Sequence, residues 1–467
     1  MSSENKIITR FAPSPTGFLH IGGARTALFN YLYTKQNNGK IILRIEDTDT
    51  ERNKDEYAVG IIDIFNWLDL KFDDTKKQSD NFSIHRQYLE KLIADGHAYI
   101  SKASEEELAE AEKEGKTLRG EVIRFKNPNK VVTFEDMIRG TVSVDTTDLH
   151  DFVIAKSLDE PIFHLSNVVD DILMGVNHII RAEEHIANTP RQILIREAIG
   201  EKETPIYAHI PLILSTDREK LSKRKHGAMA SVEYYRDNGY IKDAFINFIA
   251  FLGWNPGGER EIYSLEEMAN LFDISKVQKG GAVFNVEKLN WFNKEYIKMQ
   301  TKEEQIESIK KYLPNIEKYS NSLLEKLHPI LIERISFYGE LKNMHKVGEF
   351  DYYLNTPIFD NRNEEANIEK VIWKKSDKEN TVLNLNLIKD ILEINKEIKT
   401  EDSESFEKIW NEIYKLAEEK GKGDVLWPLR YSLSGKEKSP DPKSLLYILG
   451  IKESILRVDN SIIGLSK

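Results

Sequence analysis

The chain of 467 residues contains no cysteine. This absence excludes disulfide bonds, thiol catalysis and zinc sites built from thiolates. The chain also has no apolar run approaching the roughly 18 residues that cross a bilayer, and its first residues, Met-Ser-Ser-Glu-Asn-Lys, lack the apolar core of a signal peptide. We therefore expect a cytoplasmic protein that does not associate with membranes.

Positive charge is in short supply, because 66 lysines and arginines stand against 77 aspartates and glutamates, a formal net charge of −11. Such a balance disfavours nonspecific binding of nucleic acid by the whole surface. It leaves room for a local basic groove, because screening limits the reach of distant charges. With 40% hydrophobic residues the chain is expected to fold, and its length predicts about two to four domains.

Residues 10–23 have the pattern of a strand end, a turn rich in proline and glycine, and the start of a helix. Behind Gly22 and Gly23, apolar residues recur at the spacing of one helix face as far as residues 37–39, which can cap the helix end. We expect the first amides of this helix to be bare, and bare amides together with the helix dipole form an anion site. His20, close to that site, can donate a hydrogen bond to a phosphate oxygen.

A second buried strand is predicted at residues 40–45, which are apolar almost throughout. It is followed by Glu46, Asp47 and Asp49, at the carboxyl end, where parallel sheets bind ligands. A helical stripe of apolar residues comes next, at 58–68. This alternation of strand and helix predicts an α/β doubly wound, Rossmann-type domain.

The rest of the chain changes pattern twice. A small inserted α/β domain is predicted from four short strand-like segments, at 122–125, 131–134, 141–144 and 151–154. The first domain resumes near Pro161, and beyond about residue 235 the pattern is helical almost throughout. Residues 406–417, for example, repeat apolar positions at helical spacing, so we expect an all-α C-terminal half.

A basic turn follows another apolar strand, at 209–214, and contains Lys220, Ser222 and Lys223. Taken alone, a charged turn of this kind more often faces solvent. The glycine pair alone more often marks only a helix start, and the acidic residues after the strand at 40–45 could equally cap a helix or bind a cation. The interpretation depends on finding all of these features together, in this order.

Together the motifs resemble those of class I aminoacyl-tRNA synthetases, specifically of bacterial-type glutamyl-tRNA synthetases. Arg10-Phe-Ala-Pro-Ser-Pro-Thr-Gly with His20-Ile-Gly-Gly is similar to the family's HIGH signature, and Lys220-Leu-Ser-Lys-Arg to its KMSKS signature. Gly23 stands where many class I synthetases have a second histidine, so His20 must act without that partner. Three further segments resemble the family, and the likeness runs almost end to end: Arg-Ile-Glu-Asp-Thr-Asp at 44–49, Asn-Val-Val-Asp-Asp at 167–171 and Arg-Ala-Glu-Glu-His at 181–185.

The resemblance implies an ATP-dependent ligation of L-glutamate to tRNA(Glu). Glutamate and ATP first give glutamyl-adenylate and pyrophosphate, and a terminal ribose hydroxyl of tRNA then takes the glutamyl group. Such chemistry relies on fixed donors that meet the charge on phosphate oxygens. The implied catalytic residues are His20, Lys220 and Lys223, with Mg²⁺ arriving on ATP and no dedicated metal site in the protein. The implied ATP site comprises His20, Gly22, Gly23, Glu184, Ile213, Lys220, Ser222 and Lys223.

A selective glutamate pocket must neutralise the side-chain carboxylate of its substrate. A planar guanidinium can bind that group with two parallel hydrogen bonds and reject the uncharged amide of glutamine. The resemblance places Arg10 and Arg181 there, with Glu46 on the α-ammonium group. The alternative for Arg181 is a surface salt bridge to Glu183 or Glu184. The implied glutamate site comprises Arg10, Ala12, Ser14, Glu46, Phe163, Asn167 and Arg181.

This sequence departs from the family pattern at two places. Phe163 stands where the family usually has tyrosine, so one polar contact with the substrate is expected to be missing or supplied by water. We expect a modestly raised KM for glutamate that the Phe163→Tyr substitution reverses. Residues 99–125 lack the cysteine ligands with which some members bind zinc, so we expect no stoichiometric zinc.

The helical C-terminal half is implied to bind the anticodon. Arg430 would meet an anticodon base or phosphate, and Trp427 is either a core residue or a stacking platform for a base. The implied tRNA-binding residues are Asp49, Arg430, Ser439 and Pro440. The implied division is a catalytic domain at 1–98 and 161–235, an inserted acceptor-stem-binding domain at 99–160, a helical stem-contact domain at 236–315 and an all-α anticodon-binding domain at 316–467.

Three other readings stay open. A synthetase that also charges tRNA(Gln) with glutamate would use the same active site and differ only at its anticodon surface. A relative that glutamylates a modified base of tRNA would lack the long helical end. A noncatalytic tRNA-binding paralogue is disfavoured by the presence of His20, Lys223 and both pocket arginines. We expect a monomer.

Overall fold

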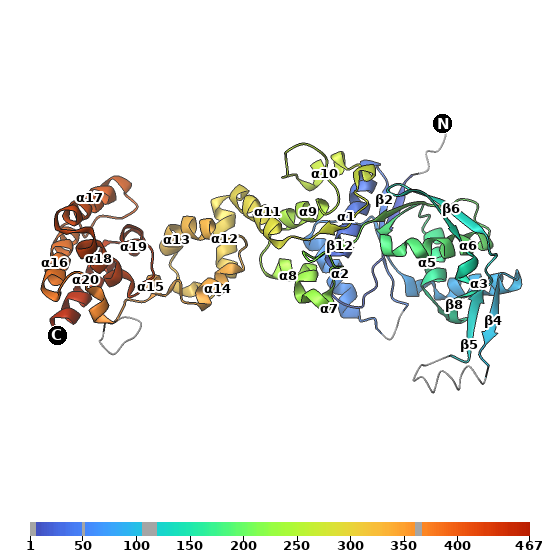
Figure 1. The fold of residues 1–467 in the computed structure, drawn as a ribbon, viewed down its shortest axis with the longest axis horizontal. Helices are drawn as coiled ribbons and strands as arrows, with labels where there is room; N and C mark the ends of the chain where they lie inside the picture. Colours follow the sequence, from blue (N-terminus) through green and yellow to red (C-terminus); the bar gives the residue numbers. More distant parts are fainter. Residues whose placement is uncertain (1–5, 49–51, 105–118, 360–366) are drawn as a thin grey trace. The chain divides into compact units, whose positions relative to one another are not determined.

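The structure, a computed structural model, describes residues 6–48, 52–104, 119–359 and 367–467. It divides into two compact units, Met1–Tyr296 and Ile297–Lys467 (Figure 1). Within the described ranges, no helix is long and apolar enough to cross a bilayer. Asp49 lies outside the described residues, so its contact with tRNA stays a prediction.

Three parallel strands form one sheet of unit 1, in the order β1-β2-β3. The central strand β2 is buried along its length apart from Lys40, as its apolar sequence predicts. Helices join each strand to the next, as a doubly wound fold requires. The elements are β1 (Ile8–Phe11), α1 (Ile21–Gln36), β2 (Lys40–Ile45), α2 (Asp55–Trp67) and β3 (Asp74–Lys77).

The second half of the doubly wound region is built around parallel strands β10 and β11, which belong to a separate, four-stranded sheet, here called the main sheet. It adjoins β1 at Asn177, whose backbone N–H donates to the Ile8 carbonyl at 3.2 Å and whose Oδ1 accepts from the Ile8 N–H at 2.9 Å. The residues that follow β1, β2, β10 and β11 line one cavity, the arrangement expected at the carboxyl edge of a parallel sheet. The second half consists of β10 (His178–Ala182), α6 (Thr189–Ile199) and β11 (Ile206–Ile210).

The four strand-like segments between residues 122 and 154 are strands, but they belong to two different sheets. One antiparallel sheet has the order β4-β5-β8-β9, whereas the hairpin β6-β7 pairs with β11 where Asp136 lies opposite Tyr207. The hairpin thus extends the main sheet. The elements are β4 (Ala98–Lys102), β5 (Glu121–Phe125), β6 (Val131–Asp136), β7 (Gly140–Asp145), β8 (Phe152–Ser157) and β9 (Glu160–Pro161).

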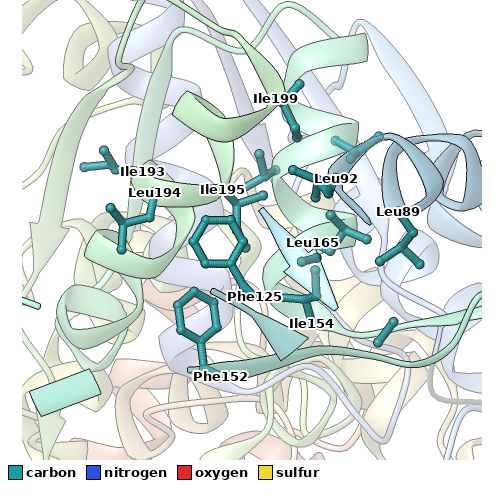
Figure 2. Packing of buried hydrophobic residues seen from close by; sticks show 14 of the residues in the cluster. Leu89, Leu92, Phe125, Phe152, Ile154, Leu165, Ile193, Leu194, Ile195 and Ile199 are labelled. Carbon is teal, nitrogen blue, oxygen red and sulfur yellow. The ribbon is translucent and has the colours of Figure 1, made fainter. Parts of the chain in front are cut away.

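Both sheets share one hydrophobic core. Figure 2 shows the part of this core around Phe125, Phe152 and Ile154 of the antiparallel sheet. Phe125 and Phe152 stack with ring centres 5.2 Å apart, in the same cluster as Leu165 and Ile195. The helices that contribute to it are α3 (Phe82–Ala94), α5 (Phe163–Leu173) and α6. Because α5 also carries Asn167 and Asp171, this core fixes the helix that supplies one wall of the cavity.

The basic turn is anchored on both sides. Ahead of it β12 pairs with β13, and the Leu221 N–H donates to the Ile213 carbonyl at 2.9 Å. Behind it, His20 bridges to Ser231. The remaining elements of this part of the chain are β12 (Ile213–Leu214), α7 (Lys223–His226), α8 (Val232–Asp237), α9 (Lys242–Ala250), α10 (Leu265–Leu271), β13 (Ala282–Val283) and α11 (Val286–Met299).

In the described residues of unit 2 the regular secondary structure is all helical, as the sequence predicts. The predicted helix at 406–417 is α17, and its apolar residues Phe406, Ile409, Ile413 and Ala417 are all buried. Its helices are α12 (Lys302–Tyr312), α13 (Asn321–Arg334), α14 (Glu340–Lys346), α15 (Asp351–Leu354), α16 (Lys378–Ile394), α17 (Ser403–Lys420), α18 (Lys422–Ser434), α19 (Pro442–Leu449) and α20 (Ile451–Ser466).

Candidate active site

Every residue predicted to bind ATP or glutamate lines one cavity of about 890 Å³ in unit 1. Residues 10–23 supply one wall, α5 and the end of β10 supply a second, and the basic turn supplies a third. The predicted residues in this lining are Arg10, Ala12, Ser14, His20, Gly22, Gly23, Glu46, Phe163, Asn167, Arg181, Glu184, Ile213, Lys220, Ser222 and Lys223. Segments far apart in the sequence therefore meet as the motifs suggest.

The start of α1 differs from the prediction of bare amides. The Gly22 N–H donates to Nδ1 of His20 at 2.9 Å, so the histidine caps the helix that it precedes. Because Nδ1 accepts this bond, the proton of the neutral ring is on Nε2. Burial, reinforced by the nearby charge of Lys223, lowers the pKa of His20 to about 4. At neutral pH His20 is therefore an uncharged hydrogen-bond donor.

The helix end at 37–39 agrees with the prediction. Helix α1 ends at Gln36, and Asn38 adopts φ of 51°, the left-handed conformation expected of a cap. Arg25 on the same helix is buried and donates to the carbonyls of Leu252 and Pro211. The apolar sequence pattern around Arg25 does not predict these contacts. The helix that begins at the cavity is thus tied to the chain on both sides of the basic turn.

The lysines of the basic turn are exposed and already engaged with groups of the protein. Lys220 forms an ion pair with Glu184, and the side chains of both are about half exposed, at 56% and 47%. Lys223 is the first residue of α7 and donates to the carbonyl of Phe18, in the turn that leads to His20. The two signature motifs are therefore in direct contact. Burial lowers the pKa of Lys223 from its ordinary value.

The glutamate end of the cavity contains a buried cluster of two arginines and two carboxylates. Asp171 accepts from Nε of Arg10 at 3.1 Å and from Arg44 at 2.6 Å. Arg44 also donates to Glu46 at 3.0 Å, and Asn167 donates to the same Glu46 oxygen at 2.8 Å. Burial opposes ionisation of Asp171, but the two arginines outweigh it and hold its pKa below the ordinary value. The cluster keeps Arg10 and Glu46 in fixed positions.

Arg181 is buried, at 6% exposed, and its surroundings differ from those of Arg10. The proposed alternative, a surface salt bridge, is wrong, because Glu183 pairs with Arg139 and Glu184 with Lys220. Within the described part of the chain no carboxylate forms an ion pair with Arg181, which instead donates to the His185 carbonyl at 3.5 Å and to three uncharged side-chain acceptors. These acceptors are Nε2 of His209 at 3.1 Å, Oε1 of Gln192 at 2.8 Å and Oγ1 of Thr189 at 2.8 Å. Burial, with a smaller effect from Arg10, lowers the pKa of Arg181 to about 10, so it remains charged at neutral pH.

Four residues at the glutamate end were not identified from the sequence as individual members of the site. Arg44 and Asp171 lie within the quoted motifs. Arg44 is two residues from Glu46 along a strand direction, and Asp171 is four residues from Asn167 on a helix, so each pair lies on one face. Gln192 donates to Asn167 at 3.1 Å, and His209 contacts Arg181. No local pattern marks Gln192 or His209.

Phe163 is the first residue of α5 and lines the cavity, with its ring 5.7 Å from that of His185. Burial lowers the pKa of His185 to about 4, with Arg181 as the next contribution, so this ring is neutral too. The edge of the Phe163 ring offers no hydrogen bond in this position. Among the described residues, no cluster of histidine, aspartate or glutamate has an arrangement that could hold a metal ion.

In unit 2, the residues predicted to contact tRNA lie at and after the end of α18. The guanidinium of Arg430 lies 4.7 Å from the ring centre of Trp427 and donates to the Glu437 carbonyl at 2.9 Å. Trp427 is partly buried, with its ring 5.4 Å from that of Trp373, so it packs within the unit. Ser439 and Pro440 follow α18 and are partly buried. The ring of Trp427 thus supports the cation that would meet nucleic acid.

Comparison with known proteins points to the same family as the residues that line the cavity. Residues 6–121 and 111–291 match the family described as "tRNA synthetases class I (E and Q), catalytic domain", and residues 304–462 match an "Anticodon binding domain". A glutamate–tRNA ligase of Aquifex aeolicus is 39% identical over 97% of this chain and 99% of its own length. Glutamate–tRNA ligase 1 of Helicobacter pylori is 37% identical over 97% and 98%.

Solved structures give the same result. The crystal structure of a glutamate tRNA ligase from Elizabethkingia meningosepticum in complex with its amino acid is 34% identical to this chain, with a TM-score of 0.81, and covers 98% of this chain and 100% of its own. The glutamate-tRNA synthetase of Elizabethkingia anophelis has a TM-score of 0.80 at 33% identity. The chain therefore belongs to the class I tRNA synthetases of the glutamate and glutamine family.

Proposed function

We propose that this chain ligates L-glutamate to tRNA(Glu) at the expense of ATP. The similarity to glutamate–tRNA ligases over nearly the whole chain supports this activity. The observation that carries the choice of amino acid is Arg181, a buried cation that lines the cavity and has only uncharged partners among the described residues. A buried charge without a counterion is costly, and the side-chain carboxylate of glutamate would relieve that cost.

Adenylation joins an oxygen of the glutamate α-carboxylate to the α-phosphorus of ATP, and the bond to the bridging oxygen of pyrophosphate breaks. Negative charge builds on the phosphate oxygens and on the leaving pyrophosphate. Neutral His20 donates through Nε2, and Lys220 and Lys223 supply positive charge at that end of the cavity. In the second step the terminal ribose hydroxyl of tRNA attacks the acyl carbon, and AMP leaves.

The glutamate site uses the buried end of the cavity. Arg181 and Arg10 bind the side-chain carboxylate, and Glu46 binds the α-ammonium group. Arg10 and Glu46 share the anchors Asp171 and Arg44, so binding requires no large rearrangement of these side chains. The other residues of the site are Ala12, Ser14, Phe163 and Asn167.

The ATP site uses the turn before α1 and the basic turn. Lys220 can exchange its contact with Glu184 for phosphate oxygens at little cost, because an exposed ion pair is worth only about 0–1 kcal/mol. Lys223 would exchange its hydrogen bond to the Phe18 carbonyl for a charged acceptor. Gly22, Gly23, Glu184, Ile213 and Ser222 complete the site. The metal that accompanies ATP would be Mg²⁺, which neutralises phosphate charge when bound.

For tRNA we propose the division expected from the sequence, with residues 99–160 on the acceptor stem, 236–315 on the rest of the stem and 316–467 on the anticodon. Arg430, Ser439 and Pro440 would contact the anticodon. We further propose a cytoplasmic monomer; light scattering of the purified protein tests its oligomeric state.

The function is tested by aminoacylation of tRNA(Glu) and tRNA(Gln) transcripts, with glutamate and glutamine offered separately. Charging of tRNA(Glu) with glutamate is the expected result, and charging with glutamine in preference to glutamate would refute the pocket assignment. Glutamate charging of tRNA(Gln) as well would identify an enzyme that serves both tRNAs. Complete absence of ATP–pyrophosphate exchange in the presence of tRNA would refute the catalytic function.

A further inference from the structure

Arg181 is held by a pair of residues that no motif singled out, Asp136 and His209. Both are buried, at 4% and 0% exposed. Nε of Arg181 donates to Nε2 of His209 at 3.1 Å, and Nδ1 of His209 lies 2.6 Å from Oδ2 of Asp136. The three side chains form a chain of hydrogen bonds from the end of β6, through β11, to β10, and its last member lines the cavity.

The order of these contacts fixes the tautomer of His209. Nε2 can accept from the guanidinium only if it carries no proton, because Arg181 has donors and no acceptor. The ring proton is then on Nδ1, where it donates to Asp136. A carboxylate that accepts only is the group that selects this tautomer.

Asp136 is itself immobilised by the backbone. One of its oxygens, Oδ1, accepts from the N–H groups of Ile138 and Arg139 at 2.9 and 2.8 Å. The other, Oδ2, accepts from the His209 N–H at 3.0 Å in addition to the ring. With four donors around it, the carboxylate cannot turn toward Arg181 without losing bonds in a buried place.

The intervening ring changes the electrostatics of the pocket. A carboxylate in direct contact with Arg181 would neutralise it, as Asp171 does for Arg10. A neutral imidazole holds the guanidinium by a hydrogen bond while leaving its charge uncompensated. We propose that Asp136 and His209 are positioning residues that fix Arg181 and keep its charge available for the side-chain carboxylate of the substrate. This inference rests on the proposed glutamate specificity, and it assigns the support of that specificity to two residues behind the pocket.

Protonation of His209 would break this arrangement, because an imidazolium cannot accept from Arg181 and repels it. The titratable and charged groups that face His209 are Arg181 from β10, Asp136 and Arg139 from β6 and the turn after it, Tyr207 from its own strand, and His185. Burial lowers the pKa of His209, against the opposing effect of Asp136, so the ring is neutral at pH 7. Weaker glutamate binding is therefore expected only below pH 6.5.

Two substitutions at one position separate positioning from packing. His209→Gln retains an acceptor near the place of Nε2, whereas His209→Phe retains a ring and removes the acceptor. In ATP–pyrophosphate exchange in the presence of tRNA, we expect His209→Phe to raise the KM for glutamate about 10- to 100-fold, the loss of one hydrogen bond to a charged group. His209→Gln is expected to raise it less than about fivefold, and both variants should leave the KM for ATP unchanged.

The pH profile gives a second readout that packing alone would not change. The wild-type KM for glutamate should rise as the pH falls below 6.5 and through the lowered pKa of His209, and the rise should be smaller in His209→Gln, which has no ring to protonate. His178→Gln, a half-buried histidine at the start of β10 that contacts Asn177, serves as a matched control and should behave as wild type.

Three outcomes would overturn the proposal: an unchanged glutamate KM in His209→Phe, equal increases in the KM for glutamate and for ATP, or identical pH profiles in His209→Gln and wild type. If His209→Phe fails to fold, the His209→Gln profile still decides. Wild-type protein with no glutamate-dependent exchange would instead refute the proposed function, so the two failures are distinguishable.

Discussion

The two ends of the cavity are built differently. At the glutamate end, Arg10, Glu46 and Arg181 are at most 7% exposed and are held by buried partners. At the phosphate end, Lys220 and Lys223 are exposed, and their partners are a surface glutamate and a backbone carbonyl. Selection between similar amino acids needs fixed, desolvated groups, because only there does an unmatched substrate leave a buried charge unpaired. Neutralising phosphate needs positive charge that can move onto the ligand, and exposed lysines supply it.

The largest effect is expected from Arg181→Ala. Removing one partner of a buried charge contact costs about 2–5 kcal/mol, which corresponds to a fall in kcat/KM for glutamate of about 30- to 4,000-fold. The KM for ATP should change little, because Arg181 lies at the other end of the cavity. Arg181→Lys, which keeps the charge without the planar fork, should recover part of the loss. An equal loss for both substrates would show that the two ends do not act separately.

Lys223→Ala should lower the rate of adenylate formation about 100-fold, because it removes one preorganised charge from the phosphate end. Binding of tRNA should be retained, as measured by filter binding. Lys225, two residues further on and paired with Glu219, is a matched control, and Lys225→Ala should keep the wild-type rate. A wild-type rate in Lys223→Ala would mean that the basic turn only faces solvent and takes no part in adenylate formation.

The lowered pKa of His20, at the boundary of the two ends, leads to a prediction about how stability depends on pH. The pKa of His20 is about 4 in the folded chain and about 6.5 when unfolded, so between these values the unfolded chain binds a proton that the folded chain does not. The contribution of His20 to the free energy of unfolding is constant above pH 6.5, and it decreases as the pH falls toward 4. Urea titrations of wild type and His20→Gln should show a shallower acid decline in the variant, by at most about 1.4 kcal/mol per pH unit. Identical declines would contradict the neutral His20.

The smallest effect is expected from Phe163→Tyr. A hydroxyl in the cavity can restore one hydrogen bond to the substrate, worth about 0.5–1.5 kcal/mol, so the KM for glutamate should fall about threefold. Steady-state exchange kinetics with varied glutamate measure this change. An unchanged or raised KM would mean that this position does not contact the substrate.

The sequence predicted the parts of the site that lie in continuous motifs. His20 follows from the local pattern of a helix start, Arg10 and Lys223 follow from the family resemblance that the motifs carry, and the doubly wound fold follows from alternating strands and helices. The bare helix amides were wrong at Gly22, because the side chain of His20 folds back to accept its N–H, a choice between two local partners that no periodicity expresses.

Contacts between distant segments could not be predicted. The bond between His209 and Asp136 joins residues 73 apart and depends on β6 pairing with β11, whereas the pattern of residues 131–144 was equally compatible with a separate inserted domain. At Arg181 uncharged acceptors stand in place of the alternative, a surface salt bridge, and one of them, His209, lies opposite Arg181 because β10 pairs with β11. Fold class is therefore a local property here, and charge compensation in the pocket is a property of the assembled sheet.

The central claim is that the uncompensated charge of Arg181 selects glutamate. Its most direct test is the ratio of kcat/KM for glutamate to that for glutamine, measured by aminoacylation in wild type and in Arg181→Ala. We predict a large preference for glutamate in wild type that collapses in the variant, because only the charged substrate loses its partner. A preference that survives in Arg181→Ala, with both substrates weakened equally, would contradict the claim.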